Sequence, residues 1–173
     1  VELGVPEVTV RPIGELASAL AGYVSGDVAT VHQIFGGPVS GDAFLLLDVD
    51  GAARLVALLT EADAPVGQMG VSAKEVLAEV GNILLNACLG VFGDLLEVRF
   101  TFAVPRLQLD TLRSMLGSLL VDGNDIRHAL LIGARFRIRT SNVTGCLVMT
   151  LGVTSLERFV AAVRAWAVRM GGG

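Results

Sequence analysis

Charged side chains are scarce in this chain of 173 residues: they make up 17%, where about 25% is typical of globular domains. A single lysine, Lys74, accompanies 12 arginines, and the net charge is -4. An acidic chain has no general attraction for phosphate backbones, so we expect no nucleic-acid partner. Apolar residues make up 53%, which excludes intrinsic disorder because there is ample surface to bury.

Long uninterrupted hydrophobic runs are also missing. A membrane-spanning helix needs roughly 18–20 consecutive apolar residues. The most apolar segments, Ala43–Leu47 and Ala129–Ala134, have the length of strands. The apolar content therefore predicts a thick core, and we expect no membrane insertion.

Residues that bind metals or carry redox chemistry are few. Cys88, Cys146, His32 and His128 show no metal-ligand spacing, so no metal site is expected. Both cysteines lie in apolar segments, which predicts buried free thiols in a reducing, cytoplasmic compartment. Aromatic residues make up only 5%, and neither an aromatic cage nor a glycine-rich phosphate loop supports a small-molecule sensory domain.

The chain repeats itself. Val5–Val10 matches Val104–Leu109, since both segments begin with Val-Pro and continue with strand-like alternation. Further on, Val39–Gly41 and Val143–Gly145 each open an apolar strand that a helix follows. The offset is 99 residues at the prolines and 104 at the glycines, so the halves differ by a few loop residues. The pattern predicts a duplicated α/β unit.

The duplication predicts one domain over residues 1–173, made of two repeats at about 1–61 and 71–170 with a linker at 62–70. Each repeat is expected to supply a strand, a helix, a strand hairpin and a final helix.

Two hairpins, at about 30–49 and 129–151, would turn near Gly36-Gly37 and Ser141-Asn142. Hairpins make a sheet mostly antiparallel, and apolar helices must cover it. The fold class predicted is therefore a layered α/β domain of the α+β kind.

The second repeat contains one more element, a helix-period run from Ser72 to Leu96, with Ser72 and Glu75 at capping-box spacing. The same helix should precede Pro6 in the first repeat, where only five residues remain. We therefore expect that the first long helix is absent here, whether truncated, disordered or lost. The sheet face it would cover, together with the high apolar content, is compatible with a homodimer.

Polar residues on this long helix form one stripe, because Glu75, Glu79, Asn82 and Asn86 are spaced so that they fall within about 60° of arc. The simplest interpretation is a solvent-facing side. Two observations favour a functional line instead. A solvated face usually mixes basic residues with Glu, and asparagine is a poor residue in mid-helix.

Glu79-x-x-Asn82, followed after 22 residues by Pro105, resembles the signature of the CheC/CheX/FliY phosphatases of bacterial chemotaxis. In that pattern an Asp or Ser stands where this chain has Glu75. The resemblance extends over essentially the whole chain, since CheC-type proteins are pseudo-two-fold duplications with this order of elements. Members can carry two Glu–Asn sites, and this chain can carry only the second.

The resemblance implies a phosphatase that acts on the aspartyl phosphate of a CheY-type response regulator in two-component signalling. The regulator would supply Mg²⁺ and a lysine, so no cofactor of the protein's own is implied. Asn82 would hold the attacking water in line with the P–O bond, much as a Gln does in GTPases. Glu79 would pair with the regulator's lysine. Glu75, Asn86 and Pro105 would support the site, with Pro105 stopping edge pairing beside it.

A non-catalytic interaction module is the alternative, as in the flagellar switch protein FliM, which resembles this fold but lacks the Glu–Asn pair. Glu79 and Asn82 favour catalysis, whereas the absent helix and Glu75 favour a specialised member. The partners implied are a phosphorylated CheY-like regulator or a flagellar switch protein, together with a CheD-like protein.

Overall fold

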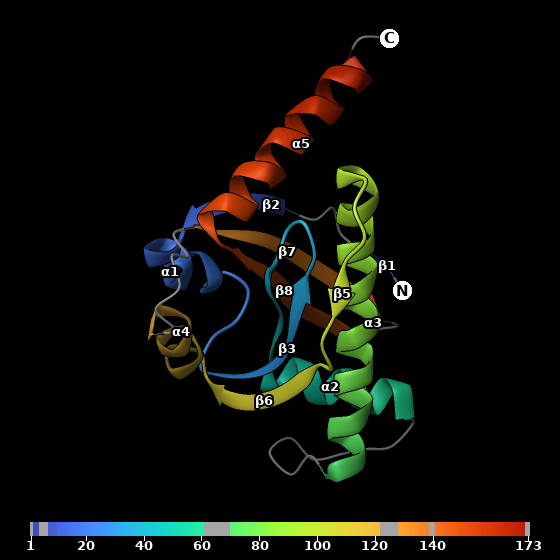
Figure 1. The fold of residues 1–173 in the computed structure, drawn as a ribbon. Helices are drawn as coiled ribbons and strands as arrows, with labels where there is room; N and C mark the ends of the chain where they lie inside the picture. The colour runs from blue at the N-terminus through green and yellow to red at the C-terminus, as the bar shows by residue number, and fades with distance from the viewer. Residues whose placement is uncertain (1, 4–6, 61–69, 122–127, 139–140, 172–173) are drawn as a thin grey trace.

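The computed structural model describes residues 2–3, 7–60, 70–121, 128–138 and 141–171 (Figure 1). In chain order the described elements are β1 (Glu2–Leu3), β2 (Glu7–Pro12), the 3-10 helix η1 (Ile13–Glu15), α1 (Leu16–Leu20), β3 (Asp27–Gly36), β4 (Gly41–Asp48), α2 (Val49–Thr60), α3 (Val71–Leu96), β5 (Thr101–Phe102), β6 (Arg106–Thr111), α4 (Leu112–Val121), β7 (His128–Ile138), β8 (Ser141–Leu151) and α5 (Val153–Gly171). The strands form one sheet in the order β1-β7-β8-β4-β3-β5, in which β2 also pairs with β7 and β6 with β3.

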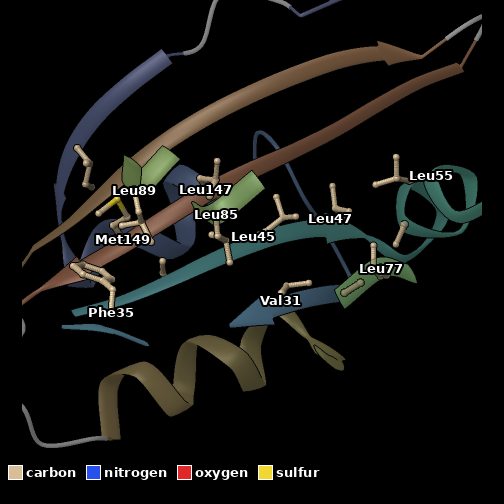
Figure 2. Close-up of a cluster of buried hydrophobic side chains, with 14 of the residues drawn as sticks. Val31, Phe35, Leu45, Leu47, Leu55, Leu77, Leu85, Leu89, Leu147 and Met149 are labelled. Atoms are coloured by element: carbon tan, nitrogen blue, oxygen red, sulfur yellow. The ribbon is translucent and has the colours of Figure 1, made fainter. Parts of the chain in front are cut away.

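Every strand pair in this sheet is antiparallel, and helices cover both of its faces. On one face α2, α3 and α5 pack over a cluster that includes Val31, Leu45 and Leu85 (Figure 2). On the other face α1 and α4 pack over a second cluster that includes Leu16 and Met115. The predicted mostly antiparallel α+β sheet covered by helices is confirmed.

The hairpins differ from the prediction in detail. The first turns between Gly36 and Gly41, and the left-handed φ of 142° at Gly37 explains the glycine there. In the second, Ser141 and Asn142 already belong to β8, so the predicted turn lies too late in the chain. Residues 139–140, Pro6 and residues 62–69 of the predicted linker lie outside the described part of the chain. The division into two repeats stays a prediction.

The long helix α3 begins at Val71, one residue before the predicted start. Its N-cap is Gly70, with no side-chain hydrogen bond, so the predicted capping box of Ser72 and Glu75 is wrong. By length and composition alone this helix could cross a membrane, a test that core helices also pass. Its apolar character has a use in the fold, because Leu77 and Leu85 are fully buried under the sheet. The described residues of the first repeat contain no counterpart of α3.

The helix backbone comes very close to β3 at Gly81. A Cβ built at this position would lie 2.6 Å from Cγ2 of Val31, which is too close for a real contact. Glycine therefore lets α3 rest directly on the branched side chain of a sheet residue. The next residue along the helix is Asn82, so this contact also sets the distance from Asn82 to β3.

Gly81→Ala tests this contact. We expect a loss of roughly 1–3 kcal/mol in the free energy of unfolding, because the added methyl group overpacks the contact with Val31. Urea denaturation measures it. Gly90→Ala on the same helix is the matched control, since nothing lies within 4 Å of a Cβ there. It should gain up to about 1 kcal/mol from helix propensity. Equal behaviour of the two variants would contradict close packing at Gly81.

Both cysteines are free thiols, as predicted, and they differ in burial. Cys88 on α3 is half-buried, and desolvation raises its pKa. Cys146 on β8 is buried, and desolvation raises its pKa from 9.0 to about 12. The folded state thus favours the protonated thiol, so the stability that Cys146 contributes is present below pH 9 and is lost as the pH rises toward 12.

Native Cys146 should resist alkylation by iodoacetamide at pH 9, because the thiolate is the reactive species and burial suppresses it. Mass spectrometry of the Cys88→Ala variant isolates this single thiol. The same variant unfolded in urea should be labelled rapidly. Labelling of the native and unfolded forms at equal rates would show that Cys146 is accessible.

Candidate functional site

The predicted polar stripe lies where α3 passes the edge strand formed by β5 and β6 (Figure 1). Glu75 and Glu79 are exposed, whereas Asn82 and Asn86 are half-buried. Within the described residues, neither glutamate has a hydrogen bond or an ion pair. The stripe is therefore divided into a free carboxylate end and an amide end that faces the sheet.

A bulge interrupts the edge strand beside the amide end. Phe35 pairs with Phe102, and His32 pairs with Arg106, so residues 103–105 of the edge strand lie opposite only two residues of β3. An extra residue of this kind breaks the ladder of hydrogen bonds locally and frees backbone groups for other contacts.

Pro105 is the last residue of the bulge and is half-buried. Proline has no backbone N–H to donate to a neighbouring strand. It is tolerated here because the bulge already interrupts the ladder of hydrogen bonds. The Ala103 N–H donates to the Ile34 carbonyl oxygen at 2.9 Å. The Ala103 carbonyl oxygen accepts instead from a side chain, Nε2 of Gln33, at 3.1 Å.

Gln33 connects the bulge to the helix. Its Nε2 also donates to Oδ1 of Asn82, at 3.2 Å, and Asn86 Nδ2 donates to the same oxygen at 3.0 Å. Gln33, Asn82 and Asn86 therefore form one amide chain that ends on the Ala103 carbonyl. Gln33 itself is only 2% exposed.

Three polar groups of the amide chain have no partner among the described residues. Oε1 of Gln33 and Oδ1 of Asn86 are buried acceptors without a hydrogen bond. The Nδ2 group of Asn82 donates to no described residue. The half-buried Asn82 therefore keeps its two N–H groups available at the boundary of the site.

Large apolar side chains border the amide end on the outside. Ile83 follows Asn82 and is 58% exposed, while Val104 in the bulge is 84% exposed and Phe102 is 42% exposed. Exposed apolar groups gathered next to a polar line are typical of a surface that binds another protein.

The polar stripe offers only carboxylate and amide groups for chemistry. Among the described residues no group of three or more His, Cys, Asp or Glu side chains could hold a metal ion. His32 bonds to Asp42, Nε2 to Oδ1 at 2.8 Å, and stacks on Phe44. Since side chains alternate along a strand, His32 lies on the face opposite Gln33, away from the line. What remains is a carboxylate that can pair with a cation and an amide that can orient a small molecule.

Sequence reasoning missed Gln33 and the Ala103 carbonyl. The signal for Gln33 was present, because it is a lone amide on the buried face of β3 between Val31 and Phe35. Its partner on α3 lies 49 residues away, and no local pattern connects the two.

A scan against protein-family models finds no match, and a search of curated proteins finds none either. Solved structures define the class: this is the fold of FliY, of FliM middle domains and of CheC-like chemotactic proteins, which confirms the predicted CheC/CheX/FliY-type fold.

Three solved structures illustrate the similarity. FliY of Thermotoga maritima has a TM-score of 0.68 at 15% identity, covering 93% of this chain and 82% of its own. The FliM middle domain of H. pylori has a TM-score of 0.62 at 10% identity, covering 93% and 81%. A CheC-like chemotactic protein of Shewanella oneidensis has a TM-score of 0.52 at 11% identity, covering 87% and 83%. Identities this low establish the fold alone.

Proposed function

We propose that the protein is a cytoplasmic phosphatase of chemotaxis signalling that hydrolyses the aspartyl phosphate of a CheY-type response regulator. The observation that carries the proposal is the Asn82 amide on α3, whose oxygen accepts two hydrogen bonds and whose N–H groups have no partner among the described residues. The exposed carboxylate of Glu79 lies one turn earlier on the same side of the helix.

An aspartyl phosphate is a mixed anhydride that is already activated toward water. The regulator holds its own Mg²⁺ and lysine against the phosphoryl oxygens, so what remains to be supplied is a water molecule in line with the bond that breaks. Nδ2 of Asn82 would donate to one lone pair of that water, and the other lone pair would attack phosphorus. The P–O bond to the aspartate then breaks, and free carboxylate and inorganic phosphate leave.

Docking is assigned to the groups around Asn82. Glu79 would pair with the regulator's lysine, because it is exposed and has no partner in the described part of the chain. Ile83 and Val104 would pack on the apolar surface of the partner and exclude bulk water. Pairing and packing together would hold the amide over the phosphate.

A non-catalytic binding module is the second candidate. The exposed apolar border formed by Phe102, Ile83 and Val104 would serve binding alone equally well. A FliM domain of this fold, with a TM-score of 0.57 at 14% identity, was crystallised in a complex with FliG. On this alternative the chain would bind a flagellar switch protein and leave its phosphorylation unchanged.

Asn82→Ala tests the phosphatase proposal. With a CheY homologue charged by acetyl phosphate in Mg²⁺, we expect the wild type to accelerate phosphate release and the variant to lose about 10²–10³-fold of that acceleration, as for other removed donors. Gln108→Ala, which removes an exposed amide from β6, is the matched control and should be fully active. Binding without any acceleration by the wild type would favour the module.

Glu79→Lys tests docking. Replacing an attraction with a repulsion at an exposed pair should raise KM for the phosphorylated regulator about tenfold, with a smaller change in kcat. Asp94→Lys makes the same charge change at the far end of α3 and should leave KM unaltered. A shift that is equal in the two variants would indicate a long-range charge effect in place of a specific pair.

A further inference from the structure

The direction of the Asn82 amide follows from a single backbone atom. The Ala103 carbonyl oxygen can only accept, so the Gln33 group that faces it at 3.1 Å must be its NH₂. That same NH₂ faces Asn82 at 3.2 Å, so the atom of Asn82 that it meets must be the oxygen. Asn86 therefore also presents its NH₂ to this oxygen.

Two donors use both lone pairs of the Asn82 oxygen. A flipped Asn82 would bring its own NH₂ against the NH₂ groups of Gln33 and Asn86, which is unfavourable at hydrogen-bond distance. The amide is consequently held with Nδ2 away from the chain. Gln33 is essential to this arrangement because its NH₂ group hydrogen-bonds both the Ala103 carbonyl and Asn82.

Gln33 lies on the edge where the long helix α3 brings an asparagine to the sheet. Gln33 is buried and leaves its own Oε1 without a partner among the described residues, which is costly for the fold. Apolar packing of the core does not account for this residue, whereas the orientation of Asn82 does.

We propose that Gln33 is a positioning residue for Asn82. The Ala103 carbonyl fixes the orientation of the Gln33 amide, and the Gln33 amide in turn keeps the Asn82 N–H groups pointing out of the protein. The role in turnover rests on the proposed phosphatase function. Gln33 touches neither the phosphate nor the water and acts only through Asn82.

Turnover of the charged CheY homologue provides the first test. Gln33→Met fills the same space without an amide, and we expect kcat to fall at least tenfold with KM unchanged, because Glu79 and the apolar border are untouched. Thr30→Val is the matched control: Thr30 is buried on the same strand, also has an unpartnered polar atom, and lies on the other face. It should keep full kcat. An unchanged kcat in a folded Gln33→Met variant would overturn the proposal.

Proton exchange in the wild type provides a second test that does not depend on turnover. In ¹H–¹⁵N spectra, both Nε2 protons of Gln33 should be protected from solvent, because each is hydrogen-bonded, whereas the Nδ2 protons of Asn82 should exchange rapidly. Asn82→Asp and Gln33→Met assign the signals by their disappearance. Protected Asn82 protons together with exchanging Gln33 protons would overturn the proposal.

The two proposals fail separately. A wild type that does not accelerate phosphate release but shows the expected exchange pattern would remove the phosphatase function and retain the positioning of Asn82. An active wild type with the reverse exchange pattern would retain the phosphatase and remove the role of Gln33.

Discussion

The contact between the backbone of α3 and the side chain of Val31 determines the geometry of everything around it. Gly81 makes the contact feasible because any larger residue would collide with the valine. Helix and strand are then close enough for Asn82 to meet Gln33 across the interface. A helix held one side chain farther from the sheet would leave both amides without this bond, and Asn82 would be free to turn.

The site places demands on the fold that a purely structural helix would not. Two buried acceptor oxygens, on Gln33 and Asn86, stay without partners among the described residues. Each such group reduces stability compared with an apolar residue of the same shape. The large buried clusters on both faces of the sheet supply the stability that offsets this loss. The protein thus uses its high apolar content to maintain a small polar assembly at its edge.

The parts of the fold that could be predicted from the sequence were those encoded locally. The 3.6-residue period of α3 and the alternation after Val104-Pro105 are visible in short windows, and they gave the elements and the line of four polar residues. The helix start was wrong because Gly70, with an extended ψ, takes the N-cap position that Ser72 was expected to fill. The second hairpin was misplaced because Ser and Asn are typical turn residues, whereas β8 already begins at Ser141.

The orientation of Asn82 could not be predicted, because it depends on register. Only the pairing of β3 with both β5 and β6 places three residues opposite two and turns the Ala103 carbonyl toward Gln33. Sequence periodicity identifies which side of α3 carries Asn82. It does not indicate which atom of the amide faces outward.

The chain from Ala103 through Gln33 to Asn82 and Asn86 consists entirely of amides and a peptide carbonyl. None of these groups gains or loses a proton in the physiological range. A lower pH in the cell therefore does not change the direction of the Asn82 N–H groups. A histidine at a similar place would gain a proton and change its hydrogen bonds. Any sensitivity to acidity at this surface must come from groups outside this amide chain.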